Sequence, residues 1–176
     1  PSSSCLLRPV RADSAARVVE LIEDGIMLSR NLARGLSSVD RSGDGLMEAL
    51  EDFASSTSEL FKISCRFECP LPVLINDIHA AEHLYRIAQE AVGNAIKHGE
   101  ARHIQTRLEA SRGGTPQHII EDGAGRPPFH VNGKGMGLRI MSYRADRIGA
   151  TFSIRRRDPR GTIVNCFLPV VRETIL

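Results

Sequence analysis

The sequence predicts an α+β domain, a two-layer sandwich in which helices cover one face of a mixed, mostly antiparallel sheet. Two observations support this class: the hydrophobic pattern changes repeatedly between periods of about 3.6 and 2, and the strand-like runs are short and interspersed with helices. The chain has 176 residues, of which 41% are hydrophobic and 25% charged. This composition excludes a disordered chain, a collagen and a disulfide-rich miniprotein.

Charge and hydrophobicity exclude two further classes. Lys and Arg number 23 against 21 Asp and Glu, and no basic tract is long, so we expect no nucleic-acid partner. No apolar stretch approaches the roughly 20 residues that span a bilayer, so we expect no direct membrane insertion. The scattered cysteines indicate a reducing, cytoplasmic location, with membrane attachment of a longer parent protein left open. Because the chain starts at Pro1 without a leader, we expect it to be part of a longer protein.

The N-terminal region is predicted to be a long helix followed by a linker. Asp13 and Ser14 can cap a helix that begins at Ala15 and continues, with apolar residues at helical spacing, as far as residue 36. Its apolar stripe is broad, which indicates a partner helix or a second subunit. Residues 37–44 are small and turn-prone and predict the linker. Residues 45–176 then form the main domain.

The main domain is predicted to alternate helices and strands. Helices are expected from about 46 to 61 and from 138 to 148, and a long central helix is expected to begin at a cap provided by Asn76 or Asp77. Strands are expected at 63–69, 73–75, 104–110, 152–154 and 163–167. Pro116 lies near the start of the strand that leads to residue 121, which predicts that this strand is short or at an edge.

One stripe of the long central helix has the chemistry of a metal–phosphate site. Glu90, Asn94, Lys97 and His98 lie beside the predicted core stripe rather than opposite it. Asn94 offers an uncharged oxygen suited to Mg²⁺, and Lys97 and His98 can donate to phosphate oxygens. A solvated flank with helix-stabilising pairs explains the same spacing.

Two glycine-containing segments follow. In Glu121-Asp122-Gly123-Ala124-Gly125, a carboxylate at a strand end precedes glycines that allow close approach, although an Asp-Gly turn between strands explains it nearly as well. Gly133, Gly135 and Gly137 alternate directly before an amphipathic helix. Backbone N–H groups and a helix N-terminus then meet in a potential anion site; a flexible hinge is the alternative.

These motifs, in this order and followed by Arg160-Gly161-Thr162, resemble the Bergerat-fold (GHKL) ATP-binding superfamily, which includes gyrase, Hsp90 chaperones, MutL and sensor histidine kinases. The segment from His83 to His98 resembles the N box of sensor kinases of the nitrate-sensor and desaturase-sensor type. Residues 122–125 and 133–137 resemble the first and second glycine boxes, and Gly161-Thr162 resembles the end of the third. The resemblance extends from about Ala15 to Pro169.

The resemblance implies a pocket for ATP and Mg²⁺. Asp122 is expected to accept a hydrogen bond from the adenine amino group, and Asn94 to coordinate Mg²⁺. Lys97 and His98 would face phosphate or ribose oxygens. Glu90 occupies the position where hydrolysing relatives keep a carboxylate that activates water. The other implied nucleotide-binding residues are Gly123, Gly125, Gly133, Gly135, Gly137 and Thr162.

The implied function is that of the catalytic domain of a two-component sensor histidine kinase. Such a domain donates the γ-phosphoryl group of ATP to a histidine on a dimerisation helix, for relay to the receiver domain of a response regulator. No acceptor motif is present, and residues 1–36 resemble the second helix of a dimerisation hairpin, so the fragment alone is not expected to phosphorylate itself. Two alternatives stay open: an ATP hydrolase that uses Glu90, and a non-catalytic, anti-sigma-like nucleotide-binding module.

Overall fold

A computed structural model describes residues 45–124 and 136–170 of the chain. The predicted first helix and linker, and the glycines at 125, 133 and 135, lie outside the described residues. All described elements belong to one compact unit that spans Ser38–Leu176.

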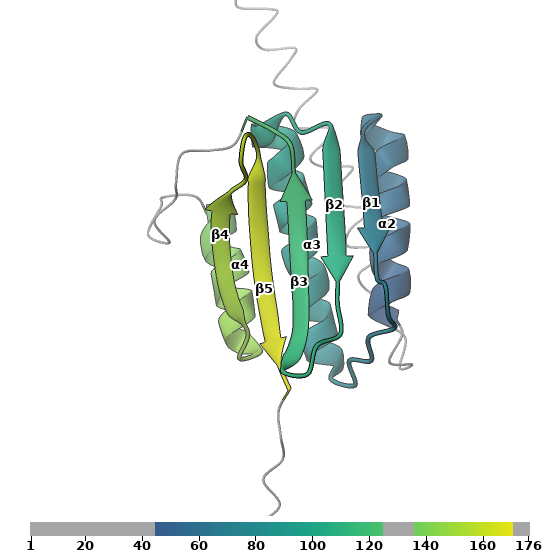
Figure 1. Cartoon of the computed structure of the whole chain (residues 1–176), viewed down its shortest axis with the longest axis vertical. Coiled ribbons are helices and arrows are strands. Elements are labelled where there is room, and N and C mark those ends of the chain that lie inside the picture. Colours follow the sequence, from purple (N-terminus) through teal and green to yellow (C-terminus); the bar gives the residue numbers. More distant parts are fainter. Residues whose placement is uncertain (1–44, 125–135, 171–176) are drawn as a thin grey trace, which may run out of the picture. The chain divides into compact units, whose positions relative to one another are not determined.

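The described chain forms three helices and one five-stranded sheet (Figure 1). In chain order the elements are α2 (Gly45–Phe61), β1 (Ser64–Glu68), α3 (Ile78–Gly99), β2 (His103–Leu108), β3 (Gly114–Glu121), α4 (Met136–Arg147), β4 (Thr151–Arg156) and β5 (Thr162–Pro169). The sheet order is β1-β2-β3-β5-β4, with β1 and β2 parallel and every other pair antiparallel. The predicted α+β class with a mixed, mostly antiparallel sheet is therefore confirmed.

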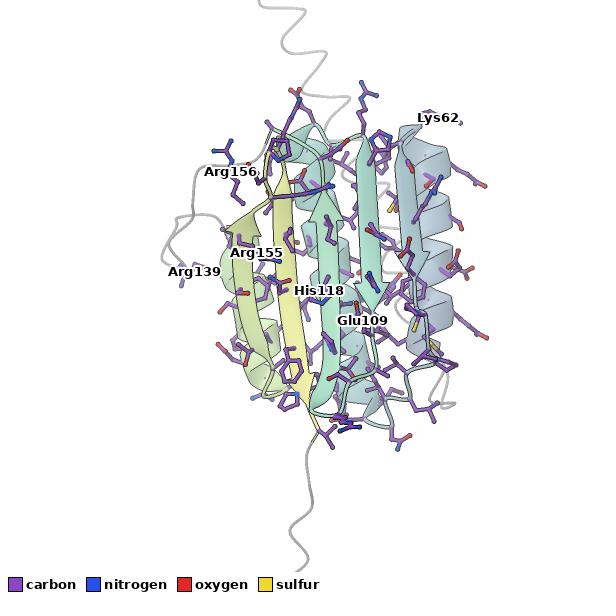
Figure 2. The ribbon with its side chains drawn as sticks, in the orientation of Figure 1. Lys62, Glu109, His118, Arg139, Arg155 and Arg156 are labelled. Carbon is purple, nitrogen blue, oxygen red and sulfur yellow. The ribbon has the colours of Figure 1, made fainter. Side chains whose placement is uncertain are left out.

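All three helices lie on the same face of the sheet (Figure 1). Helix α2 packs on β1, α3 on β2 and β3, and α4 on β4. The layer between them is filled by apolar side chains such as Leu50, Leu84, Ile104 and Ile119, all almost fully buried. Their burial supplies the main driving force for this arrangement. The opposite face carries polar side chains such as His118 and Arg155 (Figure 2).

Helix α3 begins and ends where its sequence provides caps. The Asp77 carboxylate accepts hydrogen bonds from the backbone N–H groups of His79 and Ala80, at 2.9 and 3.2 Å, which satisfies two of the free donors of the first turn. Glu100 adopts the left-handed conformation and ends the helix. The caps fix where α3 begins and ends, while burial of its apolar stripe sets the rotation of the helix and with it the direction in which its polar stripe points.

Two expectations about strands are wrong. Residues 73–75 form no strand. Val73 and Ile75 are buried and Leu74 is exposed, so the segment alternates like a strand, but it pairs with no strand of the described sheet. Strand β3, which contains Pro116, is eight residues long and lies inside the sheet. Pairing with β2 begins only at Gln117, so the missing N–H of Pro116 costs no bond within that ladder.

Among the described helices, none combines the length and apolar character required to cross a bilayer.

Candidate nucleotide-binding site

A cavity of about 330 Å³ opens between α3, the start of α4 and the ends of three strands. Its size is within the range of small-molecule sites. Both apolar and polar side chains line it. The lining residues are Glu90, Ala91, Asn94, Ala95, Lys97, His98, Gly99, Ile119, Glu121, Met136, Gly137, Leu138, Met141, Ile154, Thr162 and Val164.

Helix α3 supplies the polar wall of this cavity. Glu90, Asn94, Lys97 and His98 all line it, as their shared helical stripe predicts. The side-chain amide nitrogen of Asn94 donates to Oε1 of Glu90 at 3.2 Å. This bond directs the Asn94 amide so that its oxygen is left as an acceptor or metal ligand.

The start of α4 lies directly against this wall. A Cβ atom added at Gly137 would be 2.1 Å from Oε1 of Glu90 and 3.1 Å from Nδ2 of Asn94. A side chain at residue 137 would require the end of the Glu90 side chain to move from this position. Because the first N–H groups of a helix have no partner within the helix, the approach places free donors beside the oxygen atoms of α3.

Glu121, the last residue of β3, provides the carboxylate at the other end of the cavity. Strand alternation puts it on the same face as Gln117 and Ile119, which point toward the helices. The Glu121 side chain is only 5% exposed, and its Oε2 accepts a hydrogen bond from the N–H of Gly123. The glycine motif does not mark Glu121 as a ligand; the alternation of Ile119 and Glu121 is the sequence signal that identifies it.

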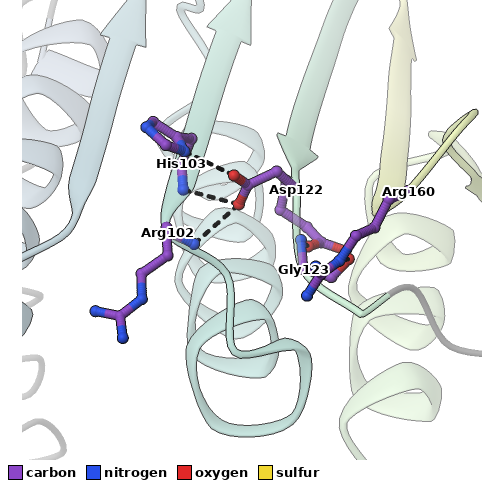
Figure 3. Close-up of polar contacts among 6 residues, drawn as sticks. Arg102, His103, Asp122, Gly123 and Arg160 are labelled. Carbon is purple, nitrogen blue, oxygen red and sulfur yellow. Dashed lines mark hydrogen bonds and ion pairs between the residues drawn. The ribbon is translucent and has the colours of Figure 1, made fainter.

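The structure does not bring Asp122 into the cavity, contrary to the expectation from sequence. Asp122 follows the end of β3, and its side chain points toward Arg102 and His103 at the start of β2 (Figure 3). Oδ1 accepts from the N–H groups of Arg102 and His103 at 2.9 and 2.8 Å, and Oδ2 lies 2.6 Å from Nδ1 of His103. Burial raises the pKa of Asp122, but these hydrogen bonds outweigh it and lower the pKa to about 2.

The other predicted ligands fall into three groups. Thr162 and Gly137 line the cavity. Gly123 does not line it but supports Glu121, and a Cβ there would lie 2.3 Å from the carbonyl oxygen of Gly99. Gly125, Gly133 and Gly135 lie outside the described residues.

Comparison with known proteins agrees with this architecture. A family model described as "Histidine kinase-, DNA gyrase B-, and HSP90-like ATPase" matches residues 79–172, more than half of the chain. The chain belongs to this ATPase family. The matched segment contains every described element from α3 to β5 that surrounds the cavity, and the resemblance seen in the motifs is confirmed.

Within the family, the chain is homologous to sensor kinases. It is 30% identical to the nitrate/nitrite sensor protein NarX of Escherichia coli over 126 residues, which cover 71% of this chain and 21% of NarX. The chain thus spans about a fifth of the length of NarX, and the same share of the related sensor protein NarQ of Escherichia coli.

Solved structures show the same fold. The ATP-binding domain of PrrB from Mycobacterium tuberculosis has a TM-score of 0.58 at 22% identity, covering 69% of this chain and 91% of that domain. Full-length ShkA, solved in complex with AMPPNP, has a TM-score of 0.56 at 19% identity, covering 96% of this chain and 40% of ShkA.

Proposed function

We propose that this domain binds Mg²⁺-ATP and donates its γ-phosphoryl group to a histidine on a dimerisation helix, as the catalytic domain of a sensor histidine kinase. The observation that carries the proposal is the convergence of Glu121, Asn94 and Gly137 on one cavity. A carboxylate at one end and an amide oxygen beside free helix donors at the other match the two ends of a purine nucleotide. The complex of ShkA with AMPPNP supports the same ligand class.

Glu121 and Thr162 form the base end of the proposed site. The carboxylate of Glu121 can accept from an exocyclic amino group, and the Thr162 hydroxyl can donate or accept beside it. Ile119, Ile154 and Val164 supply apolar surface for the faces of the ring. We therefore assign the adenine-facing role to Glu121 instead of Asp122.

Asn94 and Glu90 form the phosphate end, together with Lys97, His98 and the start of α4. Carboxylate and amide oxygens suit Mg²⁺, and no group of three or more His, Cys, Asp or Glu side chains gathers anywhere in residues 45–124 and 136–170. Two protein ligands fit an ion that is bound chiefly through phosphate oxygens and water. Bound there, Mg²⁺ would neutralise phosphate charge.

The proposed reaction depends on positioning more than on covalent chemistry by this domain. A ring nitrogen of the acceptor histidine attacks the γ-phosphorus, the bond to the β,γ-bridging oxygen breaks, and ADP leaves with that oxygen. Lys97, His98 and the backbone donors of α4 would stabilise negative charge during the transfer. A response-regulator aspartate would then receive the phosphoryl group, within a kinase that self-associates through its dimerisation helices.

The proposal is tested by calorimetric titration of Mg²⁺-ATP into the chain and its Glu121→Gln and Asn94→Ala variants. Loss of a charge-assisted hydrogen bond is expected to weaken binding about tenfold or more. Glu109→Gln is the matched control, because Glu109 pairs with Arg107 on the polar face of the sheet. Equal affinity for all four proteins would contradict the assigned site.

Transfer is tested by adding a two-helix hairpin with an acceptor histidine, such as that of a sensor-kinase relative, and [γ-³²P]ATP. We expect label on the hairpin histidine and little release of free phosphate. Steady phosphate release abolished by Glu90→Gln would favour an ATP hydrolase. Binding without transfer or release would favour a non-catalytic module.

A further inference from the structure

We propose that Asp122 and Arg160 are positioning residues that hold Glu121 in place and thereby give the site its preference for adenine. The inference rests on the proposed function, because it concerns how the assigned base-facing carboxylate is aligned. Neither side chain lines the cavity. They act instead on the short turn, residues 121–124, that carries Glu121.

Asp122 fastens this turn to the start of β2. Its carboxylate takes hydrogen bonds from two backbone N–H groups, those of Arg102 and His103, and from the His103 ring (Figure 3). The Asp122 N–H donates in return to the His103 carbonyl oxygen at 3.2 Å. Four contacts therefore fix the position of the residue that directly follows Glu121.

Arg160 fastens the same turn from the opposite side. Its Nε donates to the carbonyl oxygen of Gly123 at 2.9 Å, although the two residues are 37 positions apart. The next residue, Gly161, packs so closely that a Cβ there would lie 1.9 Å from the carbonyl oxygen of Glu121. The Arg160 side chain thus reaches the turn from a loop whose backbone already touches it.

A third contact completes the support. The N–H of Ala124 donates to the carbonyl oxygen of Gly99, at the end of α3, at 2.7 Å. The turn is therefore held by β2, α3 and the β4–β5 loop together, while the N–H of Gly123 inside it binds the Glu121 carboxylate. Any shift of the turn would move this carboxylate relative to the cavity.

Base selectivity follows from this arrangement. A carboxylate held in one position can accept a hydrogen bond from the amino group at position 6 of adenine. Hypoxanthine has a carbonyl oxygen at position 6 instead, and this second acceptor repels the carboxylate. If the turn loosens, the Glu121 carboxylate can move. ATP then loses the hydrogen bond from its amino group, whereas inosine triphosphate loses the repulsion between its carbonyl oxygen and the carboxylate. The ratio of the two affinities therefore reports the alignment of Glu121.

The test measures dissociation constants of Mg²⁺-ATP and Mg²⁺-inosine triphosphate, by competition with a fluorescent ATP analogue, for the full chain and its Arg160→Met and Asp122→Ala variants. We expect the preference for ATP to fall about fivefold or more in each variant. Arg160→Lys and Asp122→Asn, which keep a donor and an acceptor, are expected to restore much of it. Arg155→Met, an exposed arginine on β4, is the control and should leave the preference unchanged.

Because both nucleotides are measured on the same sample, a reduced folded fraction affects both and cancels in the ratio. An unchanged ratio in Arg160→Met and Asp122→Ala, in a chain that prefers ATP and loses this preference in Glu121→Gln, would overturn the positioning role alone. Failure of the unmodified chain to bind either nucleotide would instead overturn the proposed function.

Discussion

At the scale of single residues, the adjacent carboxylates of Glu121 and Asp122 have different surroundings because β3 ends between them. Glu121, still in the strand, lies on its helix-facing side and lines the cavity. Asp122, in the turn that follows, contacts the start of β2. The glycine motif alone identifies the segment but not which carboxylate faces the cavity. Strand alternation could have assigned Glu121, whereas the contact between Asp122 and His103 depends on a strand pairing that sequence does not reveal.

The lowered pKa of Asp122 predicts a pH-dependent stability. In the folded chain the carboxyl has a pKa of about 2, against an ordinary value of 3.8. Its contribution to stability is therefore complete above about pH 4 and is lost as the pH falls toward 2. Urea unfolding should show the chain to be more stable than Asp122→Asn at about pH 6, with a smaller difference at about pH 3. A difference that stays constant between these pH values would contradict the assigned hydrogen bonds.

The close approach of Gly137 to Glu90 predicts that Gly137→Ala impairs the phosphate end. The added methyl group would overlap Oε1 of Glu90 and crowd Nδ2 of Asn94, so one of these side chains must move. We expect the affinity for Mg²⁺-ATP to fall about tenfold, since small displacements of positioned ligands are costly. Calorimetric titration measures the loss.

Ser142→Ala, on the same helix, is the control for this prediction and should bind normally. If Gly137→Ala bound Mg²⁺-ATP as tightly as the unmodified chain, the contact between α4 and Glu90 could not be part of the site.

At the scale of elements, α3 was the best predicted part of the molecule. Its cap, its apolar stripe and its polar stripe are all local patterns, and local patterns are what a sequence reveals most directly. Strand pairing is not local. Residues 73–75 carry the alternation of a strand without a partner, and Pro116 lies within β3 because β2 ends before it; neither outcome follows from the residues alone.

Removing the N-terminal cap of α3 is predicted to lower the stability of the domain without changing its affinity for ATP. Replacing Asp77 with Ala removes two hydrogen bonds from the first turn and should reduce the free energy of unfolding by about 1 kcal/mol. The cap is 13 residues from Glu90, or about 20 Å along the helix, so the affinity for ATP should not change. Urea unfolding and calorimetric titration measure the two quantities.

Asp77→Asn keeps a capping oxygen and should retain the stability of the unmodified chain. A stability loss of equal size in Asp77→Asn and Asp77→Ala would show that the charge, rather than the cap, stabilises α3.

At the scale of the whole molecule, one helix layer over one sheet determines which thiols can react. Burial raises the pKa of Cys65 to about 11 and that of Cys166 to about 12, so both are protonated and shielded in the folded state. Cys69, directly after β1, is only partly buried. We predict that iodoacetamide, followed by peptide mass spectrometry, labels Cys69 in the folded chain and labels Cys65 and Cys166 only as fast as the domain unfolds. Rapid labelling of Cys166 without unfolding would contradict the packing of β5.

The arrangement of the cavity is also a property of the whole molecule, because its walls come from two helices and three strands. The predicted stripe on α3 placed Glu90 and Asn94 correctly, yet the opposing Glu121 and Gly137 are brought to them only by the packing of α3 on β3 and α4. The central claim is that these groups together bind one nucleotide.

The most direct test is a crystal structure of the chain with Mg²⁺ and a non-hydrolysable ATP analogue. We predict that the adenine amino group lies within hydrogen-bond distance of Glu121 and that the Asn94 side-chain oxygen coordinates the metal ion beside the phosphates. A nucleotide bound elsewhere, or a base that contacts Asp122 while Glu121 points away, would contradict the account.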